Sequence, residues 1–303
     1  MGEKMKTAKR LDQVYKQAEI LYYDGDSRFV LMSDCHRGVG NWGDNFQPNQ
    51  NLFFSALDYY RQNHYTYIEL GDGDELWENR SMKDIIRTHS NQFWLMAQLY
   101  EEGRLYMLFG NHDRVKSNPR YTNCHCNQYY LEADDSFCPL FPDMKFHEGL
   151  ILEDVTSGNR IFLVHGNQGD FLNDTAWKLG RFLVRYLWRG LELAGILDPT
   201  SSAKNYKKKK RTEEKLADWA GKKNVILTAG HTHRPVLPPP GKGMYWNDGS
   251  CVHPRCITAM EIDQRSVCLV KWSEKVRGDR ILYVDREILA GPYPIADYFI
   301  LNR

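Results

Sequence analysis

Short apolar runs recur along the chain, and each is followed by Gly, Asp, Asn, Ser or His. Runs bounded in this way are typical of buried β-strands. We interpret five of them as strands: residues 28–32, 65–70, 105–109, 161–164 and 225–229. Residues 150–153 are expected to pair with 161–164 as a hairpin. Further strands of more antiparallel character are expected at residues 244–247, 256–262, 266–272 and 280–285.

Between these runs, apolar residues recur at helical spacing. The spacing predicts helices at residues 1–21, 49–62, 81–102 and 174–197. Residues 37–47 and the run Lys207–Arg211 are expected to be solvated loops, and residues 286–303 a terminal strand and tail. The chain contains no internal repeat and no convincing linker. We therefore predict one domain over residues 1–303, with a helical insertion at residues 171–222 that forms a cap or lid.

Composition and charge narrow the class of protein. The chain has 303 residues, of which 42% are hydrophobic and 26% charged, as in an ordinary globular protein. The net charge of +1 gives no reason to expect a nucleic-acid partner. The seven cysteines fit no standard disulfide framework, and the N-terminus has no basic-then-apolar signal. A cytoplasmic protein with reduced thiols is the expectation.

Polar residues with ligand chemistry follow the predicted strands. They are Asp34, His36, Asp72, Asn111, His112, His165, His231 and His233. Imidazole is the commonest metal ligand among side chains, and carboxylate and amide oxygens suit hard or borderline cations. A single Asp-x-His is more often a polar turn than a metal site. Several such ends can meet where strands of an open α/β sheet present their carboxyl ends, so the set predicts a metal site.

The ordered motifs resemble those of the calcineurin-like metallophosphoesterase superfamily. They read Asp-x-His, Gly-Asp-x-x-Asp/Glu with Glu75 in the last position, Gly-Asn-His-Asp/Glu, a later His, and Gly-His-x-His. The resemblance covers about residues 28–260 and implies an α/β fold, called α+β in some schemes. The implied fold is a four-layer β-sandwich flanked by helices. Asn247-Asp248-Gly249-Ser250 is similar to a segment that closes the sheet near the site in many members.

The resemblance also implies a cofactor and a role for each matching residue. The cofactor is a pair of divalent transition metals, of which manganese is favoured and iron or zinc would also suit. Asp34, His36 and His233 would hold one metal, Asn111, His165 and His231 the other, and Asp72 would bridge them. A metal-bridging hydroxide would attack phosphorus. His112 would face the leaving group, with Asp113 supporting it.

The insertion and Gly-His-Thr-His-Arg-Pro look like the UDP-2,3-diacylglucosamine diphosphatase branch, although that branch has Arg at the position of His112. The helix at 174–197 carries Lys178, Arg181, Arg185 and Arg189 on one stripe. It is either a packed helix with a solvated basic edge or a lid for an anionic, partly apolar ligand. In the second case Arg181 and Arg185 are candidate substrate contacts, and the insertion allows peripheral membrane contact. Arg37, beside His36, is a candidate phosphate contact.

These observations favour a dimetal phosphoesterase that acts on a phosphodiester, pyrophosphate or phosphomonoester of a small or lipid-linked molecule. A serine/threonine phosphoprotein phosphatase is one alternative, but a lid would obstruct a protein loop. A non-catalytic scaffold of the same fold is another, against which the intact ligand set argues. A nuclease would use the lysine run but fits poorly with the neutral charge. The sequence makes no prediction of the oligomeric state.

Overall fold

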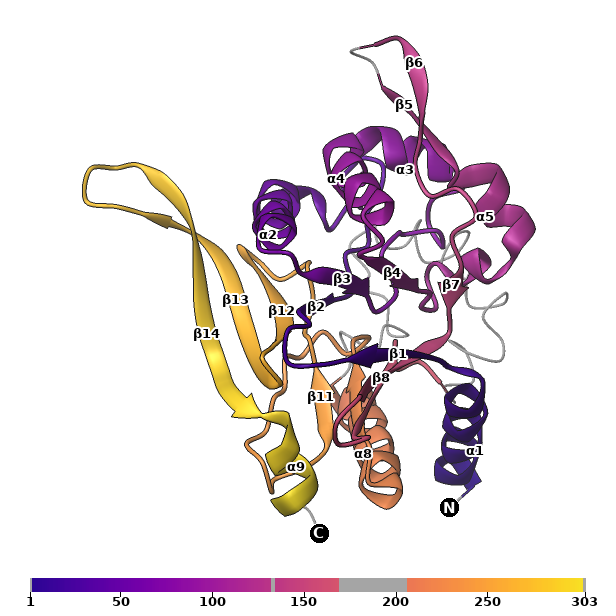
Figure 1. Cartoon of the computed structure of the whole chain (residues 1–303). Coiled ribbons are helices and arrows are strands. Elements are labelled where there is room, and N and C mark those ends of the chain that lie inside the picture. The colour runs from indigo at the N-terminus through magenta and orange to yellow at the C-terminus, as the bar shows by residue number, and fades with distance from the viewer. Residues whose placement is uncertain (1, 132–133, 169–205, 302–303) are drawn as a thin grey trace.

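Two β-sheets packed face to face form the centre of the molecule in the computed structural model, which describes residues 2–131, 134–168 and 206–301 (Figure 1). The larger sheet has the strand order β14 (Leu282–Pro294), β13 (Ser266–Val276), β12 (Cys256–Asp263), β2 (Phe29–Met32), β3 (Thr66–Glu69), β4 (Leu105–Leu108) and β7 (Phe146–His147). Strands β2, β3, β4 and β7 are parallel, whereas β12, β13 and β14 are antiparallel to their neighbours.

The second sheet has the order β1 (Glu19–Tyr23), β8 (Gly149–Asp154), β9 (Arg160–Val164), β10 (Ile226–Ala229) and β11 (Tyr245–Asn247). Strands β8 and β9 form the predicted hairpin, with Leu150 opposite Leu163. Strands β9, β10 and β11 are mutually parallel. This arrangement brings the carboxyl ends of β9 and β10 to one edge.

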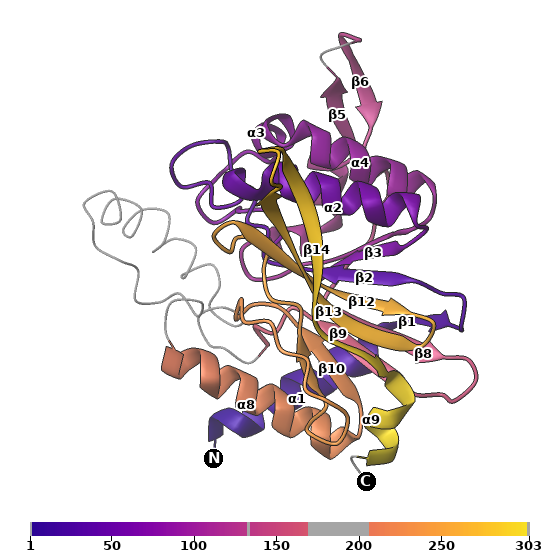
Figure 2. The same cartoon turned by 90° about the vertical axis from the view of Figure 1, so that its left-hand side faces the viewer.

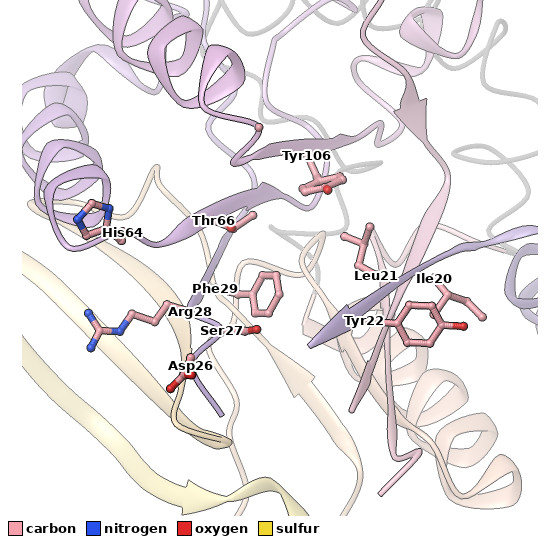
Figure 3. A pocket seen from close by; sticks show the side chains of 11 residues that line it. Ile20, Leu21, Tyr22, Asp26, Ser27, Arg28, Phe29, His64, Thr66 and Tyr106 are labelled. Carbon is pink, nitrogen blue, oxygen red and sulfur yellow. The ribbon is translucent and has the colours of Figure 1, made fainter. Parts of the chain in front are cut away.

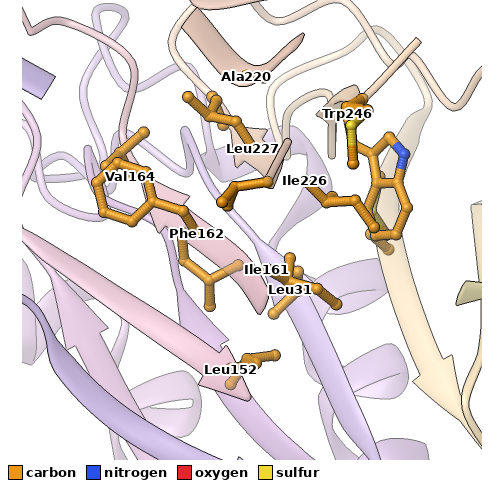
Figure 4. Packing of buried hydrophobic residues seen from close by; sticks show 14 of the residues in the cluster. Leu31, Leu152, Ile161, Phe162, Val164, Ala220, Ile226, Leu227 and Trp246 are labelled. Carbon is orange, nitrogen blue, oxygen red and sulfur yellow. The ribbon is translucent and has the colours of Figure 1, made fainter. Parts of the chain in front are cut away.

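Alternation along the strands divides the buried side chains between two cores. In β2, Phe29 and Leu31 point into the core between the sheets, and Val30 and Met32 point to the helices on the outer face. Figure 4 shows the inter-sheet packing, where Leu31 of the larger sheet lies near Leu152 and Ile161 of the second sheet. Each sheet therefore has two buried faces, which explains why its short strands read as continuous apolar runs.

Helices cover the outer faces of both sheets (Figures 1 and 2). On the larger sheet lie α2 (Gln50–Gln62), α3 (Met82–Thr88) and α4 (Ser90–Glu101), and the short helix η1 (Gln47–Asn49) precedes α2. On the second sheet lie α1 (Gly2–Gln17) and α8 (Tyr206–Lys223), side by side. Leu216, Trp219 and Ala220 of α8 belong to the same hydrophobic cluster as the second sheet, and the Trp219 ring packs on Phe162 of β9. The layers are helix, sheet, sheet and helix, which confirms the predicted fold class.

Several element boundaries differ from the sequence-based expectation. The first helix ends at Gln17, and the apolar Ile20–Tyr23 segment pairs with β8 as a strand. The helix expected at 81–102 is two helices, divided at His89, whose ring is buried against Asp44. The lysine run lies in the first turns of α8, where a solvated loop was expected. The chain ends in α9 (Ile295–Leu301), where a tail was expected.

Other elements were not expected at all. They are β7, η2 (Arg114–Ser117), α5 (Pro119–His125), and a hairpin of β5 (Gln128–Leu131) and β6 (Ser136–Pro139) that projects from the body (Figure 1). The helix expected at 174–197, with Arg181 and Arg185, lies outside the described residues, so α8 is the described part of the predicted insertion. No helix within the described ranges is long and apolar enough to cross a membrane.

Candidate metal centre

The predicted ligand residues meet at one edge of the two sheets. Asp34 and His36 follow β2, Asp72 follows β3 and Asn111 follows β4, whereas His165 follows β9 and His231 and His233 follow β10. Ligand atoms of Asp34, His36 and His233 all lie within 4.8 Å of one another. The same holds for Asp72, His165 and His231. The structure thus brings together residues from five separate segments of the sequence.

Five of these residues have the left-handed backbone conformation that side chains normally avoid. The φ angle is +51° at Asp34, +49° at His36, +51° at Asp72, +65° at His231 and +53° at His233. This conformation costs about 1–2 kcal/mol for a residue other than Gly. It persists where surrounding contacts enforce it, and such residues cluster at functional sites. Here the main-chain bonds from Asp34 N to Gly71 O (3.1 Å) and from His36 N to Asp72 O (2.9 Å) join the two loops.

The chemistry of the buried donor atoms fits a bound metal. Asp34 Oδ1, His36 Nε2, Asn111 Oδ1 and His165 Nε2 are buried and form no hydrogen bond with any described residue. Buried polar atoms are almost always paired, so a cluster of unpaired ones needs another partner. His165 Nε2 approaches Asp72 Oδ2 to 3.0 Å, and His233 Nε2 approaches Asp34 Oδ1 to 3.0 Å. Nitrogen and oxygen atoms that converge in this way suit a divalent transition metal.

Hydrogen bonds at the opposite ring nitrogens orient the imidazoles. His165 Nδ1 lies 3.0 Å from Leu70 O, and His36 Nδ1 lies 3.0 Å from Glu75 Oε2. An N–H that donates at Nδ1 leaves Nε2 with its lone pair directed into the site, as metal-binding histidines require. The carboxylates are held similarly, because His231 N donates to Asp34 Oδ2 (2.7 Å).

The carboxylates are ionised in this setting. Burial alone raises the pKa of Asp34, but His233 and the other histidines outweigh it and hold the pKa well below the ordinary value. For Asp72, burial also raises the pKa, and His165 and His112 bring it below the ordinary value. Both groups therefore carry the negative charge that a cation requires.

A model of the calcineurin-like phosphoesterase family matches residues 27–235, which is more than half of the chain. The chain belongs to this family. The match contains every predicted metal ligand, and it confirms the superfamily resemblance and the fold. The match identifies the family and does not distinguish its branches, so the resemblance to the UDP-2,3-diacylglucosamine diphosphatase branch stays a prediction.

Solved structures give weaker likenesses. Vps29 of Chaetomium thermophilum is 12% identical, with coverage of 86% of this chain and 96% of that chain and a TM-score of 0.38. GAP50, described as the anchor in the inner membrane complex of Plasmodium, is 11% identical, with coverage of 91% and 95% and a TM-score of 0.42. Likenesses at this level carry no argument about function. A comparison with curated proteins finds no match.

His112 lies beside the ligand groups, and one of its ring nitrogens lies within 4.8 Å of ligand atoms of His36 and Asp72. Its Nδ1 contacts the Glu75 carboxylate at 2.7–2.9 Å. Burial lowers the pKa of His112, but the charges of Glu75 and Asp72 raise it further, to a net value above the ordinary one. The Glu75 carboxylate thus contacts both His36 and His112. The sequence places Glu75 at the last position of the Gly-Asp-x-x-Asp/Glu motif but does not predict this contact.

The sequence predicts that Asp113 supports the His112 imidazole, but in the structure its carboxylate is bound elsewhere. Its Oδ1 accepts from Gly110 N at 2.7 Å, and its Oδ2 accepts from Lys116 Nζ at 2.9 Å. Asp113 therefore fixes the turn that carries Asn111 and His112. The carboxylate that orients His112 is Glu75, which comes from the loop after β3.

Arg37 is not placed to contact a substrate, which corrects the prediction. Its side chain is completely buried, with Nη1 and Nη2 bonded to both oxygens of Glu69 at 2.8 and 2.9 Å. Its Nε donates to Asp74 Oδ1 at 2.7 Å, and Lys116 Nζ lies 2.5 Å from Asp74 Oδ2. This ion-pair network lies beneath the ligand loops. An Arg that follows a ligand His was a reasonable phosphate contact, but here it packs inward.

A second set of polar contacts fixes the turn between His231 and His233. Thr232 Oγ1 donates to Glu213 Oε1 at 2.9 Å, and Arg234 Nε donates to the same oxygen at 3.0 Å. Asn247 Nδ2 donates to Gly230 O at 2.7 Å. Asn247 belongs to the segment that the resemblance placed near the site. The sequence around Glu213 contains no recognisable motif, so this contact was not predicted. It forms only when α8 meets the turn in the folded chain.

A cavity of about 420 Å³ lies elsewhere, at the amino ends of the parallel strands (Figure 3). Phe29, Thr66 and Tyr106 come from the first or second positions of β2, β3 and β4. The predicted ligands follow the opposite ends of the same strands, so this cavity is separate from the metal centre.

Proposed function

We propose that this chain is a dimetal-dependent phosphoesterase that hydrolyses a phosphodiester, pyrophosphate or phosphomonoester of a small or lipid-linked molecule. The observation that carries the proposal is the convergence of unpaired buried N and O atoms on left-handed turns at the strand ends. Asp34, His36 and His233 would hold one metal and Asn111, His165 and His231 the other, with Asp72 between them. Manganese is the metal that we favour, and iron or zinc would also suit these ligands.

When bound, two such metals neutralise phosphoryl oxygens and lower the pKa of water. The residues of the chain then have separate tasks. Asp34 and Asp72 supply the fixed negative charge, and the Nδ1 contacts to Leu70 O and Glu75 hold His165 and His36 in position. His112 keeps a proton because Glu75 and Asp72 raise its pKa, and it offers that proton to the leaving oxygen.

The test joins metal analysis to activity. Wild type, Asp72→Asn and Asp26→Asn would be assayed on p-nitrophenyl phosphate and bis(p-nitrophenyl) phosphate after manganese loading. Asp26 is exposed and lies at the opposite ends of the strands, so it is a matched control. We expect close to two metals per chain and hydrolysis for wild type and the control, with loss of both for Asp72→Asn. Metal-loaded wild type without turnover of either ester would favour the scaffold alternative.

A further inference from the structure

Two basic side chains outside the predicted ligand set, Lys209 and His253, lie on the Asp34 side of the metal centre. Both interact electrostatically with the Asp34 carboxylate, and they also interact with each other. They belong to two different segments, the first turn of α8 and the loop before β12. Neither is part of the motifs that identified the family, so each needs a separate explanation.

The attachment of α8 to the ligand turn determines the position of Lys209. Glu213 is buried, and its carboxylate accepts hydrogen bonds from Thr232 and Arg234, on either side of His233. Residues four apart lie on the same face of a helix. Lys209 is therefore one turn before Glu213, on the face directed to the ligand turn.

The charge of Lys209 is half-buried and lacks a close partner. Its exposure is intermediate, and it has no ion pair or hydrogen bond with the described part of the chain. Burial lowers its pKa, whereas the charges of Glu213 and Asp34 act in the opposite direction. Glu213 is already occupied by Thr232 and Arg234. A bound anion would offset the cost of burying this ammonium group.

The loop that carries His253 is attached to the backbone of Asp34. Ser250 Oγ donates to Asp34 O at 3.2 Å, and Cys251 N donates to the same oxygen at 3.4 Å. Asn49 Nδ2 donates to His253 O at 2.8 Å, which holds the end of the loop. The ring atom Nε2 of His253 is buried and makes no hydrogen bond with any described residue. His253 Nε2 is therefore a polar atom on the Asp34 side of the metal centre that is available to hydrogen-bond a ligand.

We infer that Lys209, together with His253, binds a second anionic group of the substrate, so that the site prefers phosphoesters carrying a further carboxylate or phosphate near the scissile phosphoryl group. This inference rests on the proposed function. Lys209 supplies the charge, and His253 supplies a hydrogen bond. The two act as specificity-determining contacts and do not enter the chemical step.

Binding of two non-hydrolysable probes tests the inference without turnover. Methylphosphonate carries one anionic group, and phosphonoacetate carries a second one. Calorimetric titration would compare their dissociation constants for manganese-loaded wild type, Lys209→Ala and Lys210→Ala. Lys210 is exposed and adjacent on the helix, and it serves as the matched control. We expect Lys209→Ala to weaken phosphonoacetate about tenfold, as for the loss of one charge-assisted contact, and methylphosphonate by less than twofold.

A second variant extends the same comparison to the other side chain. His253→Ala should weaken phosphonoacetate selectively by about threefold or more, a smaller loss because the contact is uncharged. Equal weakening of both probes by Lys209→Ala would assign Lys209 to the scissile phosphoryl group and overturn the inference. No change for either probe would also overturn it. Hydrolysis of p-nitrophenyl phosphate by the same preparation shows whether the proposed function stands independently of these results.

Discussion

The imidazole of His112 stacks on the indole of Trp77, with ring centroids 4.4 Å apart and an interplanar angle of 21°. Trp77 is buried, and Glu75 holds His112 Nδ1 from the same loop. One segment after β3 therefore fixes both the plane of the ring and its protonated nitrogen. Both contacts orient the ring and leave Nε2 free to face the site, which is the geometry that a proton donor to the leaving group needs.

The first prediction follows from this separation of roles. His112→Ala should leave both metals bound and lower kcat by about 10²–10⁴, the range for loss of a general acid. Metal analysis and steady-state assays on p-nitrophenyl phosphate would measure the two effects. His125→Ala, at an exposed position in α5, should change neither. A metal-free His112→Ala protein would show that His112 is a ligand.

The second prediction concerns the buried network under the site. Arg37→Ala would leave Glu69 and Asp74 as buried carboxylates without their shared partner. Breaking a buried ion pair from one side typically costs about 3–5 kcal/mol. Urea denaturation should show this loss in the free energy of unfolding. Arg277→Ala, where the Arg and its partner Asp279 are exposed, should change it by less than about 0.5 kcal/mol. Similar values for the two variants would mean that the network contributes little.

The sequence was sufficient to predict most of the strands of the two sheets and to single out the polar residues that meet at their ends, for a local reason. Each apolar run and the polar motif after it, such as Phe29–Met32 followed by Asp34 and His36, are contained in a few consecutive residues. The two-sheet arrangement came from the family resemblance. Periodicity alone does not distinguish one sheet from two, because both faces of each sheet are buried.

The errors occurred where packing between distant segments decides the outcome. Arg37 follows a ligand histidine, but its orientation depends on Glu69 and Asp74 in a neighbouring segment. The choice of Glu75 over Asp113 as the partner of His112 depends on how two loops meet. The lysine run continues as a helix because Leu216 and Trp219 of α8 pack into the core. None of these contacts is visible in a short window of sequence.

The third prediction concerns the pH dependence of stability. His147 is buried on β7, next to Glu19 of β1 and near Lys145. Burial lowers its pKa, and Lys145 adds to this effect while Glu19 opposes it. The unfolded chain therefore binds more protons at this position as the pH falls through about 6.5, the ordinary value. Stability contributed by neutral His147 should be lost as the pH falls from about 7 toward the lowered folded pKa.

A comparison of two proteins isolates this contribution. His147→Gln removes the titrating group, so its free energy of unfolding should fall less steeply between about pH 7 and 5 than that of wild type. Urea denaturation of the metal-free proteins at several pH values would measure both slopes. A steeper slope for His147→Gln would reverse the sign and contradict the prediction.

The last prediction concerns the close approach of two ligand loops. A Cβ atom at Gly110 would lie 2.2 Å from Asp72 Oδ1 and 2.7 Å from Asp72 N, so a side chain there must displace the proposed bridging carboxylate. Gly110→Ala should weaken metal binding by about 10–100-fold, as for the loss of a group that positions a ligand. Gly221→Ala is the control, since a Cβ there meets nothing within 4 Å and Ala favours the helix. Calorimetric titration with manganese should show wild-type affinity for Gly221→Ala. Wild-type affinity for Gly110→Ala as well would mean that Asp72 does not depend on this approach, and that the bridging position lies elsewhere.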